Sequence, residues 1–101
     1  MIPAIANNTN SNENICSKNN VSKLFLFGSA ARGIMKDKSD LDFLVSFKEM
    51  DYMRYTDCYF NLHEGLESIL KSPIDLLTDK SLSNPYFISS IEESKMLIYE
   101  S

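Results

Sequence analysis

The chain has 101 residues, which suits one domain, and 44% of them are hydrophobic, as in a folded globular protein. Its net charge of −4 disfavours direct, nonspecific binding to nucleic acid, because phosphate contacts need Lys or Arg. No apolar run approaches the roughly 20 residues of a membrane-spanning helix, and no secretory signal pattern opens the chain. We therefore expect a cytoplasmic protein in which Cys16 and Cys58 are free thiols.

Residues 1–20 read as an Asn-rich lead-in to a domain at residues 21–101. Seven of the residues from 7 to 20 are asparagine, and only Ile15 and Cys16 are apolar. Asparagine side chains compete with the backbone for hydrogen bonds and so disfavour a helix. This composition predicts a loop, with short helical pieces possible around residues 2–6 or 13–18.

Two apolar segments of strand length come next, Lys23–Phe27 and Leu41–Phe47. The first has no alternation, which suits a strand covered on both faces. The second alternates, so that Leu41, Phe43 and Val45 face a core while Asp40 and Asp42 share the other face.

The remaining elements alternate between helix and strand. Asp51 is a suitable N-cap for a helix that ends before Pro73, and its apolar stripe includes Tyr52, Tyr55 and Tyr59, which we expect mostly in the core. A strand at 74–78, a helix from Asn84–Pro85 to about 93 and a short edge strand at 96–99 follow. The order predicts an α/β (α+β) domain with a small mixed sheet, whose last strand could pair with a second copy in a homo-oligomer.

The segment between the first two strands is a candidate phosphate-binding turn. Gly28 permits close backbone approach, and Ser29 can begin a short helix whose free N–H groups and dipole favour anions. Arg32, one turn later, could reach a phosphate oxygen, although such an arginine is often simply a solvated helix residue.

Three aspartates are candidate metal ligands. Asp40 and Asp42 lie two residues apart on one strand face, and Asp75 lies within the third strand, flanked by apolar residues. Hard cations such as Mg²⁺ prefer carboxylate oxygens, and two such ions can stabilise both the attacking and the leaving oxygen in phosphoryl or nucleotidyl transfer. If its strand lies beside Leu41–Phe47, Asp75 can complete the set and help to deprotonate an acceptor hydroxyl.

Residues 24–33 and 39–45, with their Gly-Ser, spacer and Asp-x-Asp pattern, resemble the minimal nucleotidyltransferases of the DNA polymerase beta superfamily. The resemblance covers about residues 21–100 and implies a polymerase beta-like palm fold. It also implies that Gly28 and Ser29 bind the nucleotide and that Asp40, Asp42 and Asp75 bind two Mg²⁺ ions. The expectation that ATP is the substrate rests on this resemblance, since no residue in the sequence can be assigned to adenine recognition.

Family members of this size are often antitoxins, and the resemblance implies transfer of AMP from ATP to a tyrosine of a HEPN toxin partner. Relatives that modify antibiotics carry an additional acceptor domain, which favours a separate macromolecule as the acceptor here. Two alternatives stay open: a non-catalytic module that neutralises a helical toxin by occlusion, and a nucleotidyltransferase for small molecules. We expect His63 to be a partly exposed helix residue rather than a metal ligand.

Overall fold

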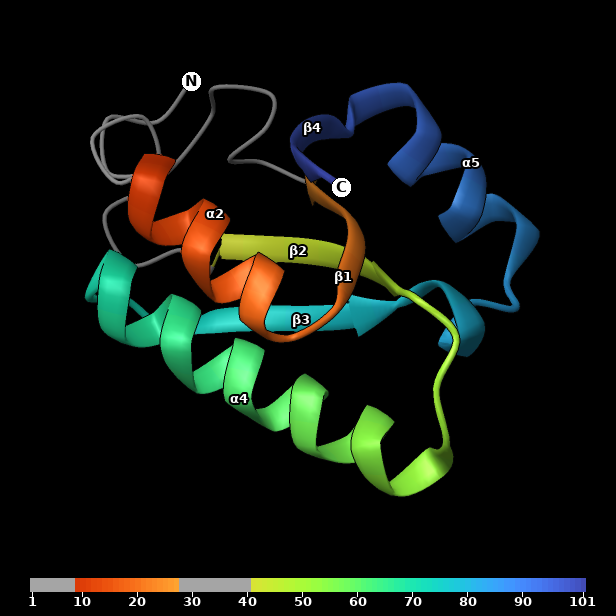
Figure 1. Ribbon diagram of the computed structural model, residues 1–101. Coiled ribbons are helices and arrows are strands. Elements are labelled where there is room, and N and C mark those ends of the chain that lie inside the picture. Colours follow the sequence, from red (N-terminus) through yellow and green to blue (C-terminus); the bar gives the residue numbers. More distant parts are fainter. Residues whose placement is uncertain (1–8, 28–40) are drawn as a thin grey trace.

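A four-stranded sheet forms the centre of the computed structural model, which describes residues 9–27 and 41–101 (Figure 1). The strands are β1 (Val21–Phe27), β2 (Leu41–Phe47), β3 (Ile74–Thr78) and β4 (Met96–Glu100). Their order is β3-β2-β1-β4, with β2 and β3 parallel and the other pairs antiparallel. The predicted mixed sheet is confirmed, including an edge position for the last strand.

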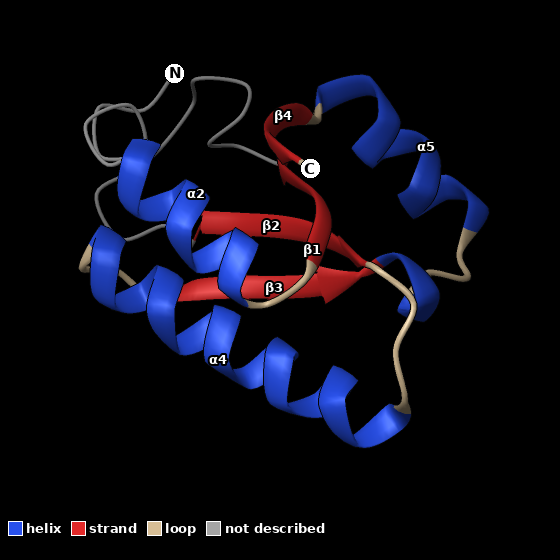
Figure 2. Cartoon of the chain, in the orientation of Figure 1, coloured by secondary structure: helices blue, strands red, loops and turns tan. Residues whose placement is uncertain are grey.

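Helices cover both faces of this sheet (Figure 2). Helices α2 (Thr9–Lys18) and α4 (Tyr52–Leu70) lie side by side across one face, and α5 (Pro85–Ser94) lies on the other; a single 3-10 turn, η1 (Asp79–Ser81), follows β3. Asp51 accepts a hydrogen bond from the Arg54 N–H, and Asn84 caps α5, so both predicted N-caps are confirmed. None of the helices in the described part of the chain is long and apolar enough to cross a membrane.

The large core lies between the sheet and the α2/α4 layer. Alternate residues of β2 and β3 point into it, and they are almost completely buried, as predicted for β2. Helix α4 contributes one residue every four positions. The core residues from these three elements are Leu41, Phe43, Val45, Leu62, Leu66, Leu70, Ile74 and Leu76.

Two sequence predictions are corrected. Residues 9–18 form one continuous helix, where the sequence predicted a loop with a short helical piece possible around 13–18. Cys16 is completely buried against the core and Ile15 packs on α4, and this burial outweighs the weak helix propensity of asparagine. The tyrosine stripe is not core throughout: Tyr52 is 82% exposed, whereas Tyr55 and Tyr59 are half-buried at the margin. Both cysteines are free and buried, as expected.

Candidate active site

Of the three predicted metal ligands, the structure describes Asp42 and Asp75, and both lie on the sheet face opposite the large core. Asp42 lies between the core residues Leu41 and Phe43 in the sequence, and Asp75 lies between Ile74 and Leu76. Side chains alternate along a strand, so both carboxylates face the α5 layer. There they neighbour Leu44 and Leu77, which belong to a smaller apolar cluster with Ile91 of α5.

Strand pairing places the two carboxylates side by side. Asp42 and Asp75 are direct partners in the parallel β2–β3 ladder. Neighbouring strands lie about 4.8 Å apart, so both carboxylates can reach one cation. Phe27 pairs with Asp42 from the other side, which makes a row Phe27–Asp42–Asp75 across the sheet. The condition under which Asp75 was expected to complete the set, a position of its strand beside Leu41–Phe47, is therefore met.

A cavity of about 480 Å³ opens at this row. Its walls include Phe87 of α5, whose ring meets Phe27 edge to face at 6.1 Å between centroids, and His63 and Tyr59 of α4. Sequence analysis did not assign Phe87, His63 or Tyr59 to the site. For Tyr59 and His63, the only signal in the sequence is the helical periodicity of α4. That periodicity does not show that the helix lies beside β3 and contributes side chains to the cavity.

The other predicted site residues, Gly28, Ser29, Arg32 and Asp40, lie outside the described residues. Gly28 directly follows Phe27, and Asp40 directly precedes Leu41 in the chain, so both are joined to ends of strands that form the row. Within residues 9–27 and 41–101, no three His, Cys, Asp or Glu side chains converge as a metal-binding group. The described part therefore supplies two of the three predicted ligands, and both offer the hard oxygen donors that suit Mg²⁺.

Tyr59 and His63 are polar groups next to Asp75. The Tyr59 hydroxyl donates a hydrogen bond to the Leu76 carbonyl oxygen at 2.6 Å, and burial, with smaller contributions from Tyr55 and Asp75, raises the pKa of Tyr59. His63 Nδ1 lies 3.4 Å from a carboxylate oxygen of Glu67, with its side chain 33% exposed. His63 is thus the partly exposed helix residue that the sequence predicted, although it also lines the cavity.

One family model matches most of this chain. The family model described as polymerase beta, nucleotidyltransferase matches residues 10–101. The chain belongs to this family. It is a nucleotidyltransferase by membership, as the Gly-Ser and Asp-x-Asp pattern predicted.

One sequence relative is named for a particular kind of nucleotidyl transfer. The chain is 46% identical over 82 residues to MJ1379 of Methanocaldococcus jannaschii, a candidate protein adenylyltransferase. The matched segment covers 81% of this chain and 79% of the relative. The similarity therefore extends over about four fifths of each chain.

Solved structures show the same fold. The structure of a candidate minimal nucleotidyltransferase has a TM-score of 0.75 with 24% identity, covering 90% of this chain and 89% of that chain. A structure of a tri-AMPylated HEPN toxin of Shewanella oneidensis in complex with an MNT antitoxin has a TM-score of 0.64 with 20% identity, covering 96% of this chain and 73% of that chain. At these identities the likeness concerns the fold.

Proposed function

We propose that the protein transfers AMP from ATP to a tyrosine hydroxyl of a HEPN toxin, with Mg²⁺ as cofactor, and thereby acts as an antitoxin. The observation that carries the proposal is the pairing of Asp42 with Asp75 on the cavity side of the sheet. The family membership, the adenylyltransferase relative and the fold shared with an AMPylated toxin–antitoxin complex support it.

In this proposal, Gly28, Ser29 and Arg32 bind the phosphates of ATP. Asp40, Asp42 and Asp75 hold the metal ions. When bound, Mg²⁺ supplies neutralisation of the charge that develops on the phosphate oxygens. Asp75 is exposed and lines the cavity, and in this proposal it takes the proton of the acceptor hydroxyl. The tyrosine oxygen forms a bond to the α-phosphorus of ATP, and pyrophosphate leaves.

Labelled ATP tests this function directly. We expect the protein, incubated with Mg²⁺ and the product of the adjacent gene, to transfer labelled AMP to a tyrosine of that partner. Asp42→Asn removes a predicted metal ligand and should abolish labelling, whereas Asp57→Asn removes an exposed carboxylate of α4 and should not. Equal labelling by Asp42→Asn and wild type would contradict the proposal.

A non-catalytic antitoxin is the second candidate, and the exposed side chains of α4 favour it. Tyr52, Met53 and Phe60 are 82%, 78% and 63% exposed. Such residues commonly anchor interfaces. This candidate predicts that Asp42→Asn still neutralises the toxin, while Tyr52→Ala does not.

A further inference from the structure

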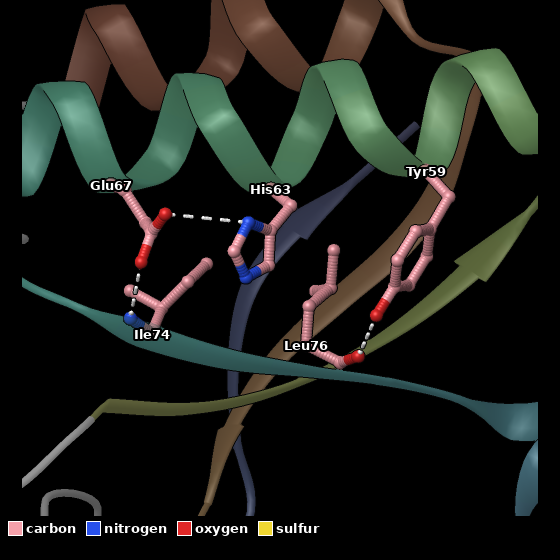
Figure 3. A network of polar contacts seen from close by, with 5 residues as sticks. All are labelled: Tyr59, His63, Glu67, Ile74 and Leu76. Atoms are coloured by element: carbon pink, nitrogen blue, oxygen red, sulfur yellow. Dashed lines mark hydrogen bonds and ion pairs between the residues drawn. The ribbon is translucent and has the colours of Figure 1, made fainter.

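The outer edge of β3 is held by side chains of α4. Among the described strands, β3 is at the end of the sheet, so its outer N–H and C=O groups have no neighbouring strand. Tyr59 donates its hydroxyl hydrogen bond to the Leu76 carbonyl at 2.6 Å, and a carboxylate oxygen of Glu67 accepts from the Ile74 N–H at 3.1 Å. Figure 3 shows both contacts, with α4 running alongside the strand.

These two contacts bracket Asp75. The backbone groups of successive strand residues point to opposite edges, so Ile74 and Leu76 face α4 while Asp75 faces β2. The hydrogen bond from the Leu41 N–H to the Pro73 carbonyl, at 3.5 Å, agrees with this alternation, because residues 73 and 75 point the same way. Asp75 is therefore fixed by the β2 ladder on one side and, through its two neighbours, by α4 on the other.

His63 fills the interval between the two contacts. Its ring stacks on Tyr59 with an interplanar angle of 25° and 6.5 Å between centroids, and its Nδ1 faces Glu67. Figure 3 shows the three side chains in one row on the face of α4 that meets β3. These three side chains, Tyr59, His63 and Glu67, cover the outer edge of β3, which would otherwise be open.

We infer that Tyr59 and Glu67 are positioning residues that clamp the outer edge of β3 and so hold Asp75 in register with Asp42. The inference rests on the proposed function, in which these two carboxylates share the metal site. It goes further because it assigns a role in the reaction to side chains of α4 that do not carry the chemistry.

The clamp matters because an unsatisfied backbone group at the outer edge of β3 is unfavourable. Ile74 and Leu76 are 4% and 5% exposed, so loss of either partner leaves a backbone group near the core poorly satisfied. The strand can then shift relative to β2, and the Asp75 carboxylate shifts with it. Groups that orient metal ligands commonly change metal affinity or activity by about 10- to 100-fold when they are removed.

Binding of Mn²⁺ alone, followed by its electron paramagnetic resonance signal, tests the clamp without turnover. We expect Tyr59→Phe and Glu67→Ala each to weaken Mn²⁺ binding by about tenfold. Glu67→Gln keeps an oxygen acceptor for the Ile74 N–H and should stay near the wild-type affinity. The matched controls are Tyr55→Phe and Glu64→Ala, which remove the same groups elsewhere on α4 and should leave Mn²⁺ binding unchanged.

Two further measurements separate positioning from plain stability. Amide hydrogen exchange should become severalfold faster at residues 74–76 in Glu67→Ala, with exchange in β1 unchanged. In the AMP-transfer assay at saturating Mg²⁺, kcat should fall while the KM for ATP stays the same, because the clamp positions the proposed base Asp75 and leaves the predicted phosphate-binding residues unchanged.

The outcomes distinguish the two proposals. Mn²⁺ affinities of Tyr59→Phe and Glu67→Ala equal to those of the controls overturn the clamp, even if both variants melt earlier than wild type. A wild-type protein that modifies its partner while the two variants do so at the same rate also overturns the clamp and leaves the proposed function standing. If Mn²⁺ binding depends on the clamp but no partner is modified, the clamp stands and the proposed function fails.

Discussion

The two faces of the sheet differ sharply although the same strands build both. The face toward α2 and α4 is closed by a large cluster of residues that are almost completely buried. Among the described residues, the face toward α5 has a smaller buried cluster of Phe27, Leu44 and Ile91, and beside it the cavity opens at Asp42 and Asp75. Stability is concentrated on the closed face and the candidate chemistry on the open one.

The period of two along a strand makes this division possible. Asp42 and Phe43 are consecutive residues, yet one lines the cavity and the other is 1% exposed in the core. Substitutions at two neighbouring positions of β2 should therefore have different effects, one on stability and the other on the reaction.

Removal of a ring from the closed face should have the largest effect. Phe43→Ala should lower the free energy of unfolding by about 4 kcal/mol, because it leaves a cavity in the core. Urea unfolding measures this change. Phe87→Ala is the control on the open face, where the ring is 41% exposed, and it should cost clearly less. Equal losses would show that the two faces contribute equally to stability.

A carboxylate on the open face should show the opposite pattern. Asp75→Asn should slow AMP transfer by about a thousandfold, which corresponds to roughly 4 kcal/mol, because it removes a predicted metal ligand and the predicted base. The midpoint of urea unfolding should hardly change. Asp79→Asn, four residues later and exposed, should affect neither quantity. A large loss of stability in Asp75→Asn would break the division between the faces.

The sequence predicted the elements that have strong local signals. Asp51 and Asn84 mark helix starts, Pro73 follows the end of α4, and the alternation in Leu41–Phe47 assigns Asp42 to the face away from the core. The pairing of Asp42 with Asp75 followed from one added assumption, that the second and third strands are neighbours, and the register confirms it.

The parts that could not be predicted depend on contacts between distant segments. Helix α2 has an unfavourable composition, and its burial on α4 becomes visible only when the two are packed together. The apolar stripe predicted for α4 included Leu62 and Leu66, but the buried row extends from them to Cys58 and Leu70 and does not include the exposed Tyr52. Phe87 reaches the site through the packing of α5, for which the sequence carries no local signal.

The contact between α2 and α4 on the closed face supports a smaller prediction. A Cβ at Gly65 would lie 2.6 Å from two side-chain atoms of Ile15, which is too close. Gly65→Ala should therefore destabilise the protein by about 1–2 kcal/mol, even though alanine is the better helix former. In an Ile15→Ala background the same change should stabilise it. Urea unfolding of the four proteins in this cycle measures the coupling.

The smallest expected effect comes from a thiol on the closed face. Burial raises the pKa of Cys16 from 9.0 to about 12. Because the folded-state pKa is the higher one, the contribution to stability is complete below pH 9 and is lost as the pH rises from 9 toward 12. By pH 9.5 the loss should still be under about 1 kcal/mol.

Cys16→Ala should remove this alkaline decline between pH 7 and 9.5, as measured by urea unfolding at each pH. The window ends below 10.0, the ordinary pKa of a tyrosine, so the raised pKa of Tyr59 at the edge of the open face contributes little to the decline. A decline that persists in Cys16→Ala would mean that a group outside the closed core causes it. The decline would then no longer distinguish the two faces.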